Sequence, residues 1–166
     1  MMDEEIVVGI VALNGGRLVG KTRLQKTAYL LQRCGMNADI KFEYHNFGPF
    51  SVDIARACND AAAEGVLDMT PTPGFHQVPY VVFETEKEPE EYLGDLPAER
   101  ARELLEIMKP YSAIELEIGA TIAFIDEESG APIEVVRSAV EELKPAKATE
   151  ERLKRAQELL EKLGIM

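Results

Sequence analysis

Apolar and polar positions near the N-terminus predict a buried segment followed by an amphipathic helix. Residues 3–14 are an almost continuous apolar run, which fits a buried helix or a buried strand, since periodicity alone does not separate the two. Residues 21–35 repeat their apolar positions at about 100° per residue, which predicts a surface helix with one buried face. The positions expected to face inward are Leu24, Thr27, Ala28, Leu30, Leu31 and Cys34, and those expected to face solvent are Lys21, Gln25, Lys26, Gln32 and Arg33.

A short strand and a further helix are expected next. Gly35 is placed to end the amphipathic helix, and residues 40–44 then alternate as a half-buried strand, which Gly48-Pro49 breaks. Ser51 is suited to cap the following helix. The inward positions of that helix are Ile54, Ala57, Cys58 and Ala61, and Gly65 is placed to end it.

Two strands complete the front part of the chain. Residues 66–67 and 80–83 read as strands joined by a loop rich in Pro, Thr and Gly, which resembles a β-wing. Helix, helix, short strand, helix and wing is the order of a winged-helix unit. We therefore expect a winged-helix-like unit over residues 1–83.

The rest of the chain is expected to form an acidic linker and a helical bundle. Acidic residues and turn formers crowd residues 84–96, which predicts a linker. Helices are expected over residues 97–109, 113–127, 132–144 and 150–163. Ser112 and Glu115 match a capping box, and Thr149 is suited to cap the last helix. The fold class predicted is mainly α with a small antiparallel β-sheet, with a helical extension over residues 97–166 packed on the first unit.

The composition is that of a protein with an ordinary apolar core. Hydrophobic residues make up 46% of the 166 residues, enough for one domain or a domain with an extension. The longest apolar runs fall far short of the ~20 residues that cross a bilayer, and Asp3, Glu4 and Glu5 stand where a secretory signal would be basic. We therefore expect no membrane contact and a cytoplasmic location. Cys34 and Cys58 have no metal-type spacing and are expected as buried, reduced thiols.

The net charge of −12 limits the classes of partner. Nucleic-acid phosphates attract a positive surface, so this charge disfavours broad binding to nucleic acid. Residues 1–60 hold seven basic and seven acidic side chains, so the acidic excess lies in residues 61–166. An acidic back half suits contact with a basic partner protein and also favours solubility. The sequence leaves open whether the chain forms homo-oligomers.

The phosphate-loop formula G-x-x-x-x-G-K-[ST] occurs once near the N-terminus. In that interpretation Gly15 and Gly20 shape the loop, Lys21 reaches the terminal phosphates and Thr22 holds Mg²⁺. A phosphate loop also needs a parallel sheet, whereas the C-terminal part predicts helices with no strands between them. We favour the entry to an amphipathic helix and keep a P-loop-type NTPase or nucleotide sensor as an alternative.

A basic cluster offers a second alternative, a winged-helix DNA-binding regulator. Its members are Arg17, Lys21, Arg23, Lys26 and Arg33. These side chains are candidates for contact with a partner protein or nucleic acid, although a solvated helix face explains them without any ligand. The helix after Ser51 would be the recognition helix, but its outward residues Asp53, Asp60 and Glu64 would repel phosphates.

The sequence contains no recognisable catalytic, metal-binding or cofactor-binding set. His45 and His76 stand apart from each other and from the cysteines, and no Ser, Cys or Thr lies in a nucleophile motif. Glu115 and Glu117, at the start of an apolar helix, are expected as surface or capping groups. A role for Cys34 or His45 that depends on a meeting in space stays open.

Three short motifs resemble a known family. They are G-K-T-R-L-Q-K-T-A-Y-L-L-Q from Gly20, F-E-Y-H-N-F-G-P-F-S-V-D-I from Phe42 and G-V-L-D from Gly65. The pattern is similar to phage-associated proteins of the Panacea antitoxin-domain type, including the SocA-like proteolytic adaptors, and to the related YwgA-like proteins of bacteria and archaea. The signature positions that match are Leu24, Gln25, Lys26, Tyr29, Gly48 and Pro49.

This resemblance implies a mainly helical fold that acts by protein contact. Such a protein neutralises a toxin or presents a client to a protease, and the family has no known catalytic residues. Together with the lack of a recognisable catalytic set, the resemblance leads us to expect a non-enzymatic interaction or regulatory module with a protein partner and no cofactor.

Overall fold

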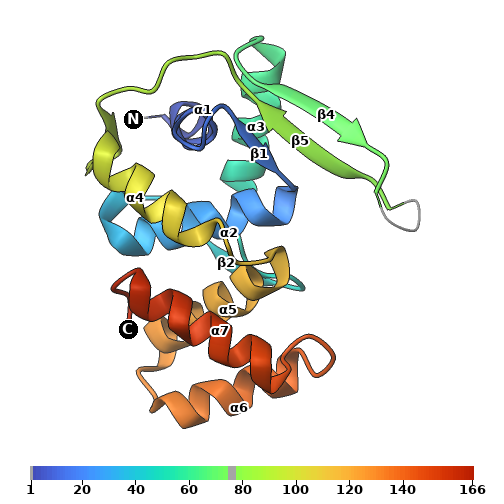
Figure 1. Ribbon diagram of the computed structural model, residues 1–166, viewed down its shortest axis with the longest axis vertical. Helices are drawn as coiled ribbons and strands as arrows, with labels where there is room; N and C mark the ends of the chain where they lie inside the picture. The colour runs from blue at the N-terminus through green and yellow to red at the C-terminus, as the bar shows by residue number, and fades with distance from the viewer. Residues whose placement is uncertain (1, 75–77) are drawn as a thin grey trace.

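The computed structural model describes residues 2–74 and 78–166, and over these ranges the fold is mainly helical with small antiparallel sheets (Figure 1). The helices are α1 (Asp3–Leu13), α2 (Lys21–Leu31), α3 (Val52–Ala63), α4 (Ala98–Met108), α5 (Ala113–Ser129), α6 (Ile133–Leu143) and α7 (Glu150–Lys162), with a π-helical turn η1 (Gln32–Met36) after α2. The strands are β1 (Arg17–Val19), β2 (Glu43–His45), β3 (Gly48–Phe50), β4 (Asp68–Thr72), β5 (Tyr80–Glu84), β6 (Tyr92–Leu93) and β7 (Leu96–Pro97). The predicted fold class is therefore confirmed.

The main sheet has the antiparallel order β1-β5-β4. Strands β4 and β5 pair antiparallel and project from the body of the molecule (Figure 1). The strand predicted at residues 66–67 begins instead at Asp68, so part of the predicted loop is β4. The sequence did not predict β1, which pairs with β5 from Arg17↔Glu84 to Val19↔Val82. The predicted break at Gly48-Pro49 is also wrong, because both residues lie in β3, which pairs with β2 as a separate hairpin.

Local capping signals place the helix starts correctly. The Ser51 hydroxyl accepts a hydrogen bond from Ile54 N at the start of α3, and Ser112 and Glu115 form the expected capping box at α5. The Thr149 hydroxyl accepts from the third residue of α7. The first apolar run is the helix α1, whose apolar side chains are buried because it packs against α3, the main sheet and α4.

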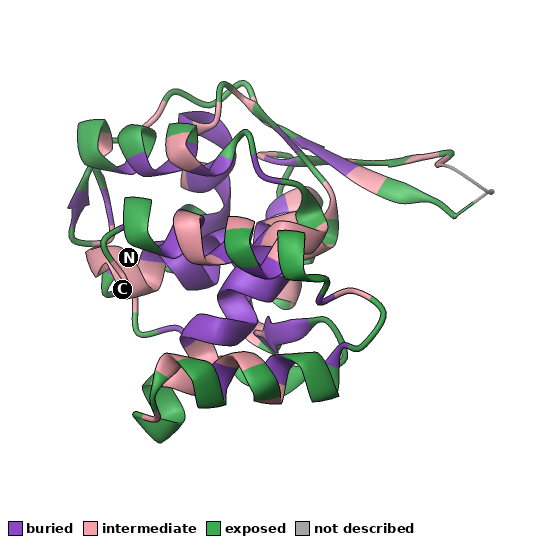
Figure 2. Cartoon of the chain, turned by 60° about the horizontal axis from the view of Figure 1, so that its bottom comes forward, coloured by how far each residue is buried: buried purple, intermediate pink, exposed green. Residues whose placement is uncertain are grey.

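One cluster of buried hydrophobic residues runs through the front and back halves of the described chain. Buried residues gather along the helices at the centre of the molecule, whereas peripheral helices show one exposed face (Figure 2). Part of the predicted linker also belongs to the core, since Leu93 in β6 and Leu96 in β7 are buried. In residues 2–74 and 78–166, no helix combines the length and apolar character needed to cross a membrane.

Candidate functional site

Two side chains of α2 hold the hairpin β2–β3 by its backbone. Lys26 Nζ donates a hydrogen bond to Pro49 O at 2.7 Å. Gln25 makes two bonds with Ser51: Nε2 donates to Ser51 O at 2.9 Å, and Oε1 accepts from Ser51 N at 2.9 Å. Both side chains are buried, so the prediction that they face solvent is wrong. Three signature residues, Gln25, Lys26 and Pro49, thus meet in space and fix the hairpin relative to α2.

The remaining signature residues complete this joint. Gly48 has φ +89°, and a Cβ on it would lie 2.7 Å from Thr121 Oγ1 of α5, so the close approach of hairpin and helix requires glycine. Leu24 and Tyr29 are buried in the core. The Tyr29 ring packs edge-on against Phe42, with 5.2 Å between centroids, and this contact supports the chain leading into the hairpin.

A buried charge cluster also contacts the hairpin. Glu117 of α5 accepts from Lys144 Nζ at 2.8 Å and from Lys147 Nζ at 3.1 Å. Lys144 Nζ also donates to Asn46 O, in the turn of the hairpin, at 3.1 Å. The hairpin is therefore held by α2 and also by the segment after α6. Glu115 is a capping group as expected, whereas the same prediction for Glu117 is wrong.

Lys26 lies close to this cluster but has no ion pair of its own among the described residues. Burial lowers the pKa of Lys26 to about 8, the charge of Glu117 opposes this shift, and Lys144 and Lys147 add to it. Among the described residues, the hydrogen-bond acceptor of Lys26 Nζ is Pro49 O. Three lysines therefore share the field of a single buried carboxylate.

A cavity of about 310 Å³ opens between α2, α3, the hairpin and the main sheet. Its apolar lining includes Leu24, Phe47, Phe50, Ile54, Met69 and Phe83. Its polar lining is Lys21, Thr22, Gln25, Lys26 and Asn59. Lys21 and Phe47 are exposed and mark the mouth, whereas Leu24, Lys26 and Phe83 are buried and form the floor.

The hairpin concentrates aromatic residues at the surface. We call residues 42–50 the aromatic hairpin. The chain has six Phe and five Tyr, and this segment contains three of the Phe and one of the Tyr: Phe42, Phe47, Phe50 and Tyr44. Phe47 is 55% exposed and Tyr44 is 38% exposed. Lys147 Nζ lies 4.5 Å from the Phe47 ring centroid, and the His45 ring stacks on Phe50 at 4.8 Å. The hairpin therefore presents large rings from a backbone that hydrogen bonds from α2 and Lys144 fix in place.

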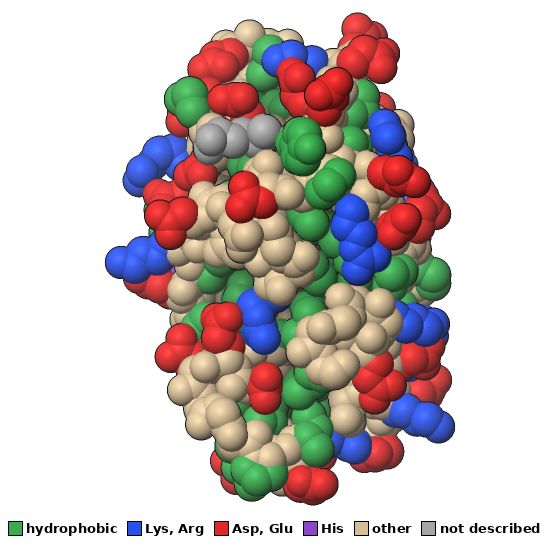
Figure 3. Space-filling view, turned by 90° about the vertical axis from the view of Figure 1, so that its left-hand side faces the viewer, with side chains coloured by type: hydrophobic (Ala, Val, Ile, Leu, Met, Phe, Trp, Pro, Cys, Tyr) green, Lys and Arg blue, Asp and Glu red, His purple; other side chains and the backbone are tan. Residues whose placement is uncertain are grey.

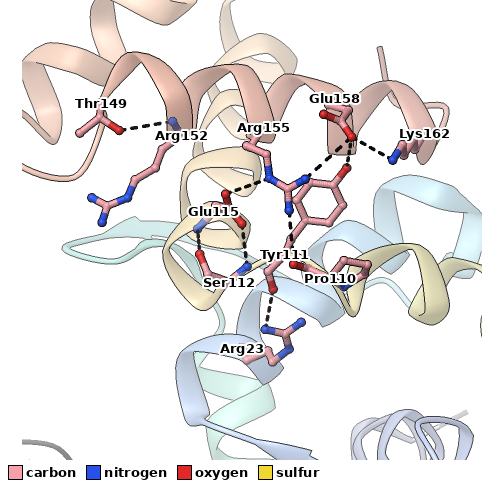
Figure 4. A network of polar contacts seen from close by, with 10 residues as sticks. All are labelled: Arg23, Pro110, Tyr111, Ser112, Glu115, Thr149, Arg152, Arg155, Glu158 and Lys162. Carbon is pink, nitrogen blue, oxygen red and sulfur yellow. Dashed lines mark hydrogen bonds and ion pairs between the residues drawn. The ribbon is translucent and has the colours of Figure 1, made fainter.

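The predicted basic cluster does not form one surface. Arg23 donates to Tyr111 O at 3.0 Å (Figure 4). It also donates to Met108 O at 3.0 Å and so caps the end of α4. Arg33 donates to Ala123 O at 2.7 Å and pairs with Glu127. With Lys26 inside as well, the exposed members of the five are Arg17 and Lys21. On the face that Figure 3 shows, basic side chains likewise stand among acidic ones without a continuous basic surface.

The network above Arg23 joins α5 and α7 to the loop between α4 and α5 (Figure 4). Arg155 Nε donates to Glu115 Oε2 at 3.1 Å, and Tyr111 OH donates to Glu158 Oε1 at 3.0 Å. Burial alone would raise the pKa of Glu115, but the hydrogen bonds from Ser112 and Arg155 lower it overall. These contacts are structural, because each polar group is matched by another from the same chain.

The phosphate-loop match is a turn, a strand and a helix start. Gly16 N donates to Val11 O at 2.9 Å, and Gly20 N donates to Val81 O at 2.8 Å. The strand between these glycines is antiparallel to β5, so the segment does not wrap around an anion. Lys21 opens α2 as an ordinary helical residue, and this geometry does not favour the nucleotide hypothesis.

The cysteines and histidines do not form a reactive set in the described chain. Burial raises the pKa of Cys34 to about 11 and that of Cys58 to about 12, which suppresses the thiolate form. His45 is exposed on the aromatic hairpin, and His76 lies outside the described residues. Over residues 2–74 and 78–166, no group of three His, Cys, Asp or Glu side chains is placed to hold a metal ion.

Sequence reasoning missed the lysines that complete the site. Lys144 and Lys147 follow a helix near the C-terminus, and nothing local connects them with Asn46, 98 residues before Lys144. Glu117 did carry a signal, because it is a carboxylate between Leu116 and Ile118 in an apolar helix. A charged residue on an apolar face is almost never fully buried unless it is paired, so its position called for a cationic partner.

Comparison with known proteins assigns neither a family nor a function. No family model matches the chain, and no curated protein matches it. The candidate site accordingly rests on its geometry: a fixed aromatic hairpin beside an apolar cavity with two lysines.

Proposed function

We propose that this protein is a non-enzymatic interaction module that binds a partner protein through the aromatic hairpin. The observation that carries the proposal is the exposure of Phe47 and Tyr44 on a backbone held by Lys26, Gln25 and Lys144. Exposed aromatic rings are typical anchors at protein interfaces. A preorganised backbone also lowers the entropy lost when a partner binds.

The family resemblance supports the same proposal. The positions that resemble Panacea-type, SocA-like and YwgA-like proteins are the residues that fix the hairpin: Gln25 and Lys26 on one side, Gly48 and Pro49 on the other. Positions with this role preserve a presented surface without performing chemistry. We propose an antitoxin-like or adaptor-like role on this basis, inside the cell.

No specific observation supports the two alternative hypotheses, an NTPase and a DNA-binding regulator. The NTPase hypothesis needs Lys21 and Thr22 at a phosphate, but the glycine amides around them donate to Val11 and Val81 carbonyls. The hypothesis of a winged-helix DNA-binding regulator needs a basic surface, but Arg23 donates its hydrogen bonds to carbonyls inside the protein. Protein binding is therefore the function that the geometry supports best.

The experiment that tests the proposal compares two exposed aromatic residues. A stoichiometric partner is first isolated from the source cell, identified and produced separately, and its affinity is then measured for wild type, Phe47→Ala and Tyr92→Ala. Tyr92, 54% exposed in β6, matches Phe47 in exposure but lies outside the hairpin. We expect Phe47→Ala to weaken binding by 2 kcal/mol or more, roughly thirtyfold, and Tyr92→Ala to leave it unchanged. Equal affinity of all three proteins would refute the role of the hairpin.

A further inference from the structure

The floor of the cavity holds a buried lysine with spare hydrogen-bonding capacity. Lys26 is 1% exposed, and its ammonium group has three N–H donors. Pro49 O accepts from one of them, and no described carboxylate forms an ion pair with Nζ. Glu117 acts on Lys26 through its field, but a buried ammonium group without an ion pair still favours an anion within hydrogen-bonding distance.

A second positive charge stands at the mouth of the cavity. Lys21 is exposed, lines the cavity and makes no ion pair with any residue that the structure describes. The described lining thus has two lysines and no Asp or Glu, in a chain that has 30 acidic and 18 basic side chains. The local charge of the cavity is positive, opposite in sign to the net charge of the protein. This local charge attracts an anion although the protein as a whole repels one.

The rest of the lining suits an apolar body. Leu24, Phe50 and Phe83 offer side chains without charge, and an apolar group placed among them leaves water. The volume of about 310 Å³ is at the lower end of the range of roughly 300–1,000 Å³ for small-molecule sites. A small ligand therefore fits this cavity better than a nucleoside triphosphate with its metal ion.

We propose that the cavity binds a small organic anion, with an apolar body between Leu24, Phe50 and Phe83 and a carboxylate held by Lys26 and Lys21. A medium-chain aliphatic carboxylate has this chemistry. The proposal goes beyond partner binding, because it concerns the interior of the cavity, which Phe50 lines, whereas the exposed Phe47 lies at the mouth.

The first test uses the wild-type protein and four probes in isothermal titration calorimetry. Octanoate has both parts of the ligand, 1-octanol lacks the charge, octylammonium reverses it and acetate lacks the apolar body. We expect octanoate to saturate one site and to bind about tenfold more tightly than 1-octanol. One charge-assisted hydrogen bond accounts for an affinity difference of about this size. Acetate and octylammonium are expected not to saturate. Absence of octanoate binding, or equal affinity for octanoate and 1-octanol, overturns the proposal.

The second test locates the site with variants. Ala55→Phe adds a ring inside the cavity, and Ala63→Phe places the same ring on the exposed end of α3. We expect Ala55→Phe to abolish octanoate binding and Ala63→Phe to preserve it. Circular dichroism confirms that each variant is folded. Undiminished binding to folded Ala55→Phe overturns the proposal, because the site would then lie elsewhere.

The third test addresses the lysines. Lys26→Met is expected to lower octanoate affinity to that of 1-octanol while leaving 1-octanol binding unchanged. If Lys26→Met does not fold, Lys21→Met at the exposed mouth tests the role of positive charge instead. We expect Lys21→Met to lower the affinity for octanoate several-fold. Unchanged octanoate affinity in both overturns the proposal. An acetylated tripeptide with a free C-terminal carboxylate and an apolar last residue is the final probe. If this peptide saturates the site and octanoate does not, the proposal is overturned, and the cavity is assigned to the C-terminus of a partner protein. The affinity of the partner protein for Phe47→Ala and Tyr92→Ala is measured separately, so failure of octanoate binding does not by itself decide the proposed function.

Discussion

Lys26 and Pro49 are 23 residues apart in the chain and are joined by a hydrogen bond of 2.7 Å between a buried ammonium group and a backbone carbonyl. Proline has no N–H, so its carbonyl is the group through which another element can hold this part of β3. The bond makes α2 both a core helix and the support of the aromatic hairpin. The following predictions test the groups that this joint depends on.

Lys26→Met is expected to change the pH dependence of stability. Folding lowers the pKa of Lys26 from 10.5 to about 8, so between these values the unfolded chain binds a proton that the folded protein releases. The free energy of unfolding of wild type should therefore rise with pH in this window relative to Lys26→Met, by up to about 3 kcal/mol. Urea unfolding at both ends of the window measures the difference. Parallel pH profiles would show that Lys26 keeps its ordinary pKa.

Gly48→Ala is expected to destabilise the protein more than Gly65→Ala. Both glycines have positive φ, +89° and +78°, so an alanine at either position carries a similar backbone strain of about 1–2 kcal/mol. A Cβ at Gly48 also meets Thr121 Oγ1 at 2.7 Å, whereas a Cβ at Gly65 has no atom within 4 Å. We expect about 1–3 kcal/mol of additional loss for Gly48→Ala, measured by chemical denaturation. An equal loss of stability in the two variants would mean that the aromatic hairpin can shift away from α5 at no cost in free energy.

Glu117→Gln is expected to be strongly destabilising, by about 3–5 kcal/mol, because it leaves the buried Lys144 ammonium without its counter-charge. Glu142→Gln, at an exposed position on α6, is the matched control and should change stability by less than about 0.5 kcal/mol. The double variant Glu117→Leu with Lys144→Met removes both charges and should regain much of the loss. A double variant no more stable than Glu117→Gln would contradict this account.

Both cysteines are expected to be unreactive in the folded protein. With pKa values of about 11 and 12, Cys34 and Cys58 carry about a thousandth or less of their thiol as thiolate at pH 8. A thiol-specific disulfide reagent should therefore titrate them slowly in buffer and rapidly in denaturant. Fast labelling of Cys58→Ser without denaturant would show that the Cys34 thiol is accessible and activated.

Local signals in the sequence were enough for most of the helices. Ser51, Ser112 and Thr149 cap α3, α5 and α7 as predicted, because a cap is a contact between residues two or three positions apart. The inward face of α3 was also correct. The strand β1 was missed, because its three residues have no pattern of their own and are strand only by pairing with β5.

The candidate site was only partly predictable. The signature positions Lys26 and Pro49 were singled out, but as separate motifs, and the helical wheel placed Gln25 and Lys26 in solvent. A wheel describes one helix against one apolar face. In α2 all residues from Leu24 to Leu31 are buried, because the helix contacts α4, α5, β1 and the aromatic hairpin.

The sequence by itself determined the helices after the first, their approximate ends and the mainly α class, because capping, turn formation and amphipathic periodicity act over a few neighbouring residues. For residues 3–14 it left helix and strand open. The tertiary structure alone decided which charged side chains are buried. Lys26, Glu117 and Lys144 come from segments far apart in the chain: Glu117 pairs with Lys144, and Lys26 and Lys144 each donate a hydrogen bond to a backbone carbonyl of the aromatic hairpin. Burial of a charge depends on partners brought from elsewhere, and no local pattern records them.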